Sequence, residues 1–390
     1  MRYFHPIVWQ LLAGTVFART ASFMTMLFLA IYLQQDFHAS ALMIGLAVGI
    51  SQLTATFGGF FGGFLTDRIG RKPVIIVSMI AWSLVFFGFA FAPNIWTLVI
   101  CNALNGLCRS FFEPASQALM IDYTDERKRR RLFSIRYTAI NLSAVVGPLV
   151  GVLIAQAGSM RTPFLITASM YAIYAIMLLW ILRHAKAPTT LHQKQRVGNI
   201  VQAIVHDHTL VLLVVASVLG TFVYSQTSST MPQLLNLTMA DGVALYSVLI
   251  AINSATVLIL QLPLSILSER VSIKTSLITG VLLFSGGMIC FQLADSWSFY
   301  IVAMIIFSVG EIFVFPMMSA VIEMIAPAHQ KATYLGVMQF QSFGGFLGPM
   351  LGGLLLTHAA SALYFVMACV SLLSLVCYLR ALRHTTRFSN

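Results

Sequence analysis

The chain has 390 residues, of which 58% are hydrophobic and only 9% are charged. Soluble domains carry about 25% charged residues, so this composition excludes a soluble globular protein and indicates an integral membrane protein. The formal net charge of +11 would suit nucleic-acid binding, but most of the 23 Lys and Arg residues lie in or beside alternate connections between apolar segments. This distribution of positive charge reflects the orientation of the spans in the membrane, so no nucleic-acid partner is expected.

Apolar segments long enough to cross a bilayer as helices, about 20 residues each, follow one another along the chain. We interpret them as twelve spans, at 7–33, 41–65, 73–92, 95–121, 132–157, 162–183, 209–236, 243–267, 275–293, 297–325, 333–357 and 361–382. A polar segment at 184–208 separates the sixth span from the seventh. It is either a solvated linker or, at 198–206, an interfacial helix with apolar pairs at helical spacing.

The basic residues predict the orientation of these spans. Alternate connections and both ends hold nearly all of them, whereas the opposite connections hold only Arg161. Because positive charge stays on the cytoplasmic side, both termini are expected in the cytoplasm. The first apolar run is far longer than the apolar region of a cleavable signal, so the first span is expected to be retained. The expected fold is an all-α membrane protein of two six-helix bundles, 1–183 and 209–390, joined by the linker.

A short charged hairpin joins the second and third spans, between Gly62 and Pro73. It places one acid against several bases at the membrane surface, between two glycines, and this pattern indicates a conformational latch. The residues expected to form the latch are Gly63, Asp67, Arg68, Gly70, Arg71, Lys72 and, at the inner end of the fourth span, Asp122.

The two halves of the sequence repeat each other. Asp67 recurs as Glu269 and Pro114 recurs as Pro316, both at an offset of 202 residues. The segment from Gly147, Pro148 and Gly151 recurs as Gly348, Pro349 and Gly352 at an offset of 201. Such registrations indicate a duplicated bundle, which usually binds its substrate between the halves near the bilayer midplane.

These motifs give the chain a resemblance to the major facilitator superfamily. The run from Gly63 to Lys72 is similar to the motif that this family carries between spans two and three. Gly147-Pro148 resembles the glycine-proline motif of its twelve-span drug:proton antiporters, with Ser143 and Val152 in place of two glycines, and the copy at Gly348-Pro349 is complete. Asn102 stands where many antiporters have a span-four arginine.

The resemblance implies alternating access and assigns roles to several residues. In the family Asp67 contacts the neighbouring half in the outward-facing state. The N-terminus of span eleven near Thr333 offers this acid a helix dipole, and Asp122 is expected to pair with Arg68 or Arg71. The degenerate hairpin copy at Glu269 has lost the glycines and most of the bases, so the two halves are not expected to be equally latched.

Ionisable side chains at membrane depth are functional candidates by default. The candidates are Arg19, Arg109, Glu113, Arg136 and Glu311. Spans one, four, seven and ten line the cavity in the family, and the repeat relates Arg109 to Glu311, so a charge pair across the cavity is one interpretation. Glu311 is expected to carry protons or anchor a cationic substrate.

Structural roles are the alternative for these charges. Arg109 and Glu113 are four residues apart and can neutralise each other on one helix face, and Arg136 can extend to the inner surface. A polar run in span seven, which includes Gln226 and Ser228, either lines the cavity or satisfies a helix loosened by Pro232. We favour the cavity.

Two transport functions follow from these features. The first is proton-coupled efflux of amphipathic drugs or lipophilic compounds; the second is proton-coupled transport of an anionic or zwitterionic metabolite, such as a sugar, amino acid or peptide. No HExxH, GxSxG or Walker sequence is present, so an enzyme is not expected. The five cysteines lack metal or redox spacing. We therefore expect a monomer in the cytoplasmic membrane that binds a small molecule, protons and lipid, without cofactor or metal.

Overall fold

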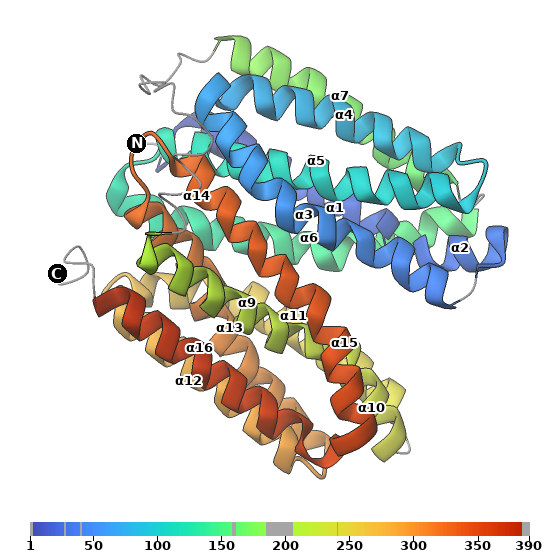
Figure 1. Cartoon of the computed structure of the whole chain (residues 1–390), viewed down its shortest axis with the longest axis vertical. Helices are drawn as coiled ribbons and strands as arrows, with labels where there is room; N and C mark the ends of the chain where they lie inside the picture. The colour runs from blue at the N-terminus through green and yellow to red at the C-terminus, as the bar shows by residue number, and fades with distance from the viewer. Residues whose placement is uncertain are drawn as a thin grey trace. The chain divides into compact units, whose positions relative to one another are not determined.

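The computed structural model describes residues 3–26, 29–39, 41–157, 161–184, 206–239 and 241–383. Within these ranges the chain is helical throughout and holds no β-strand, which confirms the all-α fold class (Figure 1). Almost all of the interfacial helix expected at 198–206 lies outside the described residues.

Contacts divide the chain into two compact units. Unit 1 comprises Met1–Arg129, Ala139–Lys194 and Ala326–Gln339, and unit 2 comprises Arg130–Thr138, Gln195–Ile325 and Phe340–Asn390. The start of α6 therefore groups with unit 2 and the segment around α14 with unit 1. The division into halves at 1–183 and 209–390 stays a prediction from the repeat.

The helices of unit 1 are α1 (Pro6–Met26), α2 (Leu29–Phe37), α3 (Ala41–Ile69), α4 (Arg71–Ala90), α5 (Ile95–Asp122), η1 (Glu126–Lys128), most of α6 (Arg129–Ala157), α7 (Thr162–His184) and α14 (Lys331–Val337). Helix α5 packs between α3 and α4, and α7 packs on α4 and α1. Asn94 caps the N-terminus of α5: its side chain accepts a hydrogen bond from the Thr97 amide and so satisfies a free helical donor.

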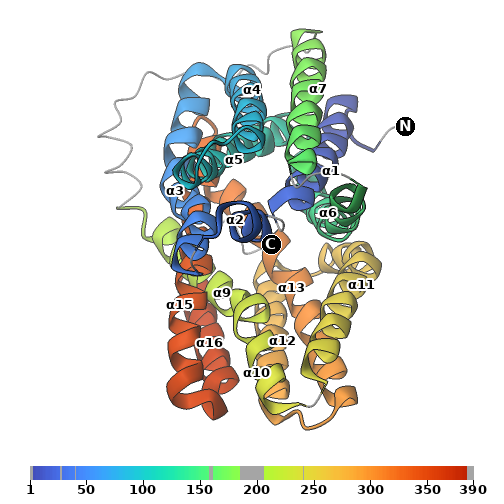
Figure 2. The ribbon, with the colours of Figure 1, turned by 90° about the vertical axis from the view of Figure 1, so that its right-hand side faces the viewer.

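The helices of unit 2 are α9 (His208–Ser229), α10 (Met231–Thr238), α11 (Gly242–Ser268), α12 (Ile273–Leu293), α13 (Trp297–Ile325), α15 (Gln341–Ala359), η3 (Ala360–Ala362) and α16 (Leu363–Arg383), with the short η2 (Met338–Phe340) at the boundary. Helix α9 lies beside α15 and α16, and α12 lies beside α13 and α16 (Figure 2). Stacked rings fill the core, with the Phe284 and Phe307 centroids 4.3 Å apart.

The apolar helices agree with the expected spans. Eleven stretches among the described residues are long and apolar enough to cross a membrane, and the last, Lys331–Arg383, is 53 residues long and contains the expected spans eleven and twelve. The expected seventh span, 209–236, is interrupted: α9 ends at Ser229 and α10 begins at Met231. Pro232 lies in the first turn of α10, where its missing amide hydrogen costs no helical hydrogen bond.

Small residues bring α15 close to α9. Gly344, Gly348 and Gly352 recur every four residues and so share one face of α15. A side chain at Gly344 would overlap the Val218 carbonyl oxygen, and one at Gly352 would overlap the Gln226 side chain. The glycine-proline motif of span eleven thus serves close helix packing in this structure.

The corresponding motif in span five does the same for α6 and α1. A side chain at Gly147 would overlap Phe23 and the Thr20 carbonyl oxygen. Ser143, which replaces a glycine of the motif, donates a hydrogen bond to the Val16 carbonyl oxygen at 3.0 Å. Pro148 lies inside the helix that continues through Gly151.

We expect Gly344→Ala to lower the thermal unfolding midpoint of the purified protein in detergent. Its methyl group would meet rigid backbone, and overpacking of this kind costs about 1–3 kcal/mol. The neighbouring Gly345→Ala is the matched control, because a methyl there meets only the Thr221 side chain at 3.6 Å. Equal midpoints for the two variants would contradict the close approach of α15 to α9.

Candidate functional site

Within the hairpin, a single residue, Gly70, separates the end of α3 from the start of α4. Gly70 has φ 100° and ψ 158°, a conformation that strains residues with a side chain, so glycine is needed here. Its amide donates to the Thr66 carbonyl oxygen at 3.0 Å, and the Thr66 hydroxyl donates to the Gly62 carbonyl oxygen at 2.7 Å. The tight turn brings the guanidinium of Arg71 at the start of α4 to within 3.6 Å of the Asp67 carboxylate near the end of α3.

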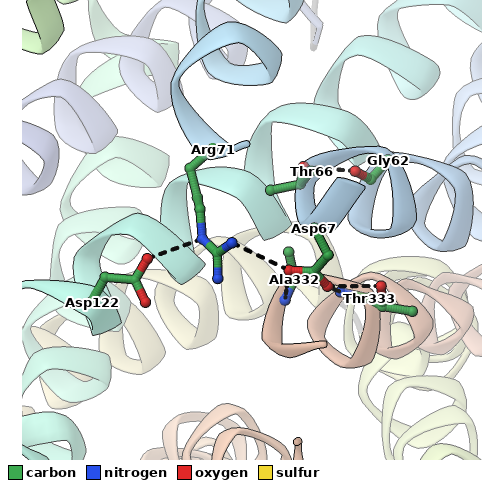
Figure 3. A network of polar contacts seen from close by, with 7 residues as sticks. All are labelled: Gly62, Thr66, Asp67, Arg71, Asp122, Ala332 and Thr333. Carbon is green, nitrogen blue, oxygen red and sulfur yellow. Dashed lines mark hydrogen bonds and ion pairs between the residues drawn. The ribbon is translucent and has the colours of Figure 1, made fainter. Parts of the chain in front are cut away.

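Asp67 binds the N-terminus of α14 (Figure 3). One carboxylate oxygen accepts hydrogen bonds from the Thr333 amide at 2.7 Å and the Thr333 hydroxyl at 2.8 Å, and the other accepts from the Ala332 amide at 3.3 Å. These amides are the free donors of a helix start, so a carboxylate there is stabilised by hydrogen bonds and by the helix dipole. Gly63 allows the approach, because a side chain there would overlap the Ala332 carbonyl group.

Arg71 lies between two carboxylates (Figure 3). Its Nε is 2.9 Å from Asp122 and its Nη1 is 3.6 Å from Asp67. The three side chains are 4–8% exposed, so this network is buried and its charges depend on one another. Of the two partners expected for Asp122, the structure selects Arg71; Arg68 is exposed and Lys72 is half-buried.

The second copy of the hairpin forms its own contact. Two hydrogen bonds of 3.0 and 3.1 Å join the Arg131 guanidinium to the Glu269 carboxylate. Arg130 donates to the Val271 carbonyl oxygen at 3.1 Å. The repeat offset of 202 residues relates Asp67 to Glu269 and also Thr333 to Arg131. Glu269 in the degenerate copy therefore has a partner at the equivalent position. This partner is the side chain of Arg131, which is 23% exposed, rather than the amides of a helix.

Away from the hairpin, unit 1 holds two half-buried arginines and one buried acid within its apolar helices. Arg19 on α1 forms an ion pair with Glu113 on α5, whereas the Arg109 Nη2 donates to the Gln52 side-chain oxygen at 2.8 Å. The pairing of Arg109 with Glu113 on one helix face is therefore wrong: Glu113 reaches the arginine of a neighbouring helix, and a neutral amide on α3 binds Arg109.

Unit 2 buries Glu311 among neutral groups. The Tyr137 hydroxyl donates to one carboxylate oxygen at 2.5 Å, and Asn253 Nδ2 donates to the other at 2.8 Å. The Tyr224 hydroxyl supplies a third hydrogen bond. Glu311 is fully buried, and within the described part of unit 2 no Arg or Lys forms an ion pair with it. Ionised Glu311 thus relies on neutral hydrogen bonds alone.

The polar contacts of Arg109 and Glu311 occupy equivalent positions. Gln52 and Asn253 are 201 residues apart and Arg109 and Glu311 are 202 apart, so each unit carries a side-chain amide beside its buried charge. Gln52, Asn253 and Tyr137 were not among the candidate residues expected from the sequence. The repeat offset would have found both amides, but nothing in the pattern identifies Tyr137.

The other candidates from the sequence lie elsewhere. Gln226 is fully buried and its Nε2 donates to the Gly348 carbonyl oxygen at 3.0 Å, so it joins α9 to α15 rather than lining a cavity. Ser228 is exposed and hydrogen-bonds to the Ser225 carbonyl oxygen at 3.1 Å. Arg136 is half-buried near the start of α6. Among the described residues, no three His, Cys, Asp or Glu side chains are grouped as metal ligands.

A separate cavity of about 370 Å³ lies where the N-terminal residues meet the connection after α5. Its lining residues are Tyr3, Phe4, His5, Pro6, Tyr123, Thr124, Asp125 and Lys128. The Lys128 ammonium is 2.9 Å from Asp125 and keeps the pKa of that carboxyl below its usual range. Neither hairpin nor any of the buried charges contributes to this cavity.

Apolar helices in two related sets, with charged side chains buried inside each, define a membrane protein of the transporter class. The Major Facilitator Superfamily model matches residues 11–250 and 240–390. The chain belongs to that superfamily, which makes it a multi-pass secondary transporter rather than an enzyme.

Similar proteins agree with this assignment. The MFS-type transporter YqjV of Bacillus subtilis is 38% identical over 90% of this chain and 86% of its own. A Na(+), Li(+), K(+)/H(+) antiporter of Planococcus maritimus is 26% identical over 87% of each chain, and the multidrug resistance protein MdtH of Cronobacter sakazakii is 27% identical over 80% of this chain and 77% of its own. The crystal structure of the human organic anion transporter MFSD10 has the same fold, with a TM-score of 0.75 at 14% identity over 95% of this chain and 98% of that one.

We expect Asp67→Ala to destabilise the protein. The substitution removes the acceptor of the α14 amides and leaves Arg71 buried with a single carboxylate, and loss of hydrogen bonds to a charged group costs about 1.5–3 kcal/mol. Chemical unfolding in mild detergent measures this. Arg68→Ala, at an exposed position one residue away, is the control and should unfold like the unaltered protein; a similar loss in both variants would show that the buried network is not responsible.

Proposed function

We propose that the protein is a proton-coupled exporter of amphipathic or lipophilic compounds. The observation that carries this proposal is Glu311, a fully buried carboxyl group whose hydrogen-bond partners are all neutral. An ionised carboxylate in apolar surroundings carries an uncompensated charge, and binding a proton removes that cost. The surrounding aromatic rings, such as Phe315 stacked on Tyr137 at 6.0 Å, suit an apolar substrate.

Exchange follows if the proton and the substrate compete for this region. When a cationic or amphipathic compound binds, the negative charge of Glu311 becomes favourable and the proton leaves; when the compound departs, the proton returns. Two of the similar proteins are named as an antiporter that uses H(+) and as a multidrug resistance protein, which supports both parts of the proposal.

Alternating access would come from rocking of the halves 1–183 and 209–390. Asp67 belongs to the first half of the sequence and α14 to the second, so the hydrogen bonds between them must break whenever these halves separate at their cytoplasmic ends. We propose that this contact, with Arg71 and Asp122 behind it, acts as a latch for the outward-facing state. The protein would work as a monomer in the cytoplasmic membrane.

Transport of an anionic or zwitterionic metabolite is the second candidate, and Arg109 favours it. Its hydrogen-bond partner, Gln52, is neutral, while Glu113 is engaged by Arg19. A guanidinium in this setting suits a carboxylate or phosphate on a substrate.

Glu311→Gln should abolish uphill efflux while the protein stays folded and inserted. The amide keeps the shape and most hydrogen bonds of the carboxyl group but cannot exchange a proton. Efflux of a fluorescent lipophilic cation from energised cells measures this, with Glu126→Gln at the exposed η1 segment as the control. Normal uphill efflux by Glu311→Gln would remove Glu311 from proton coupling.

Substrate charge separates the two candidates. If substrates are cationic, they should protect Glu311 from modification by a carbodiimide, because they bind near its carboxylate. Protection can be followed by mass spectrometry of the α13 peptide in purified protein. Protection by carboxylate compounds, with none by lipophilic cations, would favour the second candidate.

A further inference from the structure

Three polar side chains lie in one row of α11 residues that leads away from Glu311. Asn253, Val257, Gln261 and Ser265 follow one another at intervals of four residues, so each is the neighbour of the next along a row that winds slowly around the helix. At a rise of 1.5 Å per residue, the stretch from Asn253 to Ser265 covers about 18 Å. It runs toward the end of unit 2 that the basic residues mark as cytoplasmic.

Both ends of this row connect to the start of α6, which belongs to the same unit. Near the cytoplasmic end the Ser265 hydroxyl donates to the Ser134 hydroxyl oxygen at 2.7 Å. At the other end Tyr137 and Asn253 both bind the Glu311 carboxylate. The start of α6 therefore reaches both the serine pair and the buried acid, and the row on α11 runs from one of these points to the other.

Gln261 lies in that row, about one helical turn from Ser265 and about two from Asn253. Its side chain is fully buried, yet neither its amide nitrogen nor its oxygen has a hydrogen-bond partner in the structure. A buried amide of this kind is costly unless water satisfies it. Gln261 offers two donors and one acceptor, and the Ser265 hydroxyl is one helical turn away, which matches the two to four partners that a buried water molecule requires.

We propose that Gln261 and the Ser134–Ser265 pair hold a short chain of water molecules that conducts protons between Glu311 and the cytoplasm. This inference rests on the proposed function, because it gives Glu311 its route to one side of the membrane. Gln261 acts as a positioning residue, which orients water without taking the proton itself.

The proton balance of the route is simple. Protonated Glu311 gives its proton to the adjacent water and becomes a carboxylate, which Tyr137 and Asn253 stabilise. Each water or serine hydroxyl then accepts one proton and releases one, so every member of the chain ends as it began. The last proton enters bulk water near the exposed hairpin, where Arg131 pairs with Glu269.

The test follows protonation of Glu311 by infrared spectroscopy in proteoliposomes sorted so that the cytoplasmic face lies outside. A pH jump in the outer buffer changes the carboxyl band, which is assigned to Glu311 by its absence in Glu311→Gln. We expect Gln261→Met to slow this change roughly tenfold or more and to leave its amplitude unchanged, because a break in the chain raises the transfer barrier. Gln261→Asn, which stays polar and leaves room for water, should restore most of the rate.

Gln117→Met is the matched control, since it replaces another buried glutamine, in α5 of unit 1. If Gln261→Met fails to fold, the double variant Ser134→Ala, Ser265→Ala tests the same chain. An unchanged rate in Gln261→Met, or equal slowing in Gln117→Met, would overturn the inference and leave Glu311 in its role. If the Glu311 carboxyl band of the unaltered protein does not change with pH, that result would instead overturn the proposed function, and this inference with it.

Discussion

A charged side chain in an apolar interior is stable only when something nearby compensates it, and this constraint orders the whole molecule. Arg71 has two carboxylates, and Arg19 has Glu113. Two charges are compensated less fully: Arg109 has a glutamine, and Glu311 has an asparagine and tyrosines. Complete pairs hold a structure in place, whereas a charge with neutral partners can still gain from a proton or a ligand. The proposed function assigns Glu311 to chemistry on the ground of that difference.

The sequence predicted the helical content, the spans and the hairpin because composition and charge act locally. The position of Asp67 beside Thr333 was also accessible, since a family pattern named the helix that receives the acid. The partner of Glu113 was not: an arginine four residues away and an arginine on another helix offer the same charge, and only packing decides between them. The expectation that Gln226 faces a cavity differs from its observed place between two helices for a related reason. A polar residue within a span suits either a wet surface or a tight helix contact, and the glycines of α15 produce the contact.

Duplication explains why the two units share contacts but not charges. Each carries an amide on its second long helix beside a charged residue on its fourth, and each has a hairpin acid that meets a partner from a distant part of the sequence. The two units keep the same arrangement of amide and charged residue, but the charged residue is an arginine in one unit and a glutamate in the other. A carboxyl group can bind and release a proton, whereas an arginine stays charged. Two units with the same helical arrangement can thus differ in the charge at equivalent positions without any change of fold.

The contact of Asp67 with α14 has an evolutionary consequence. Two of its three donors are main-chain amides, which every residue except proline supplies whatever its side chain. Mutational drift at Ala332 and Thr333 can therefore proceed with little effect on these donors, provided that the glycines opposite keep the helices close. The equivalent contact between Arg131 and Glu269 consists of two side chains, either of which a single codon change can delete. The first contact is therefore less sensitive to substitution than the second, which depends on two particular side chains.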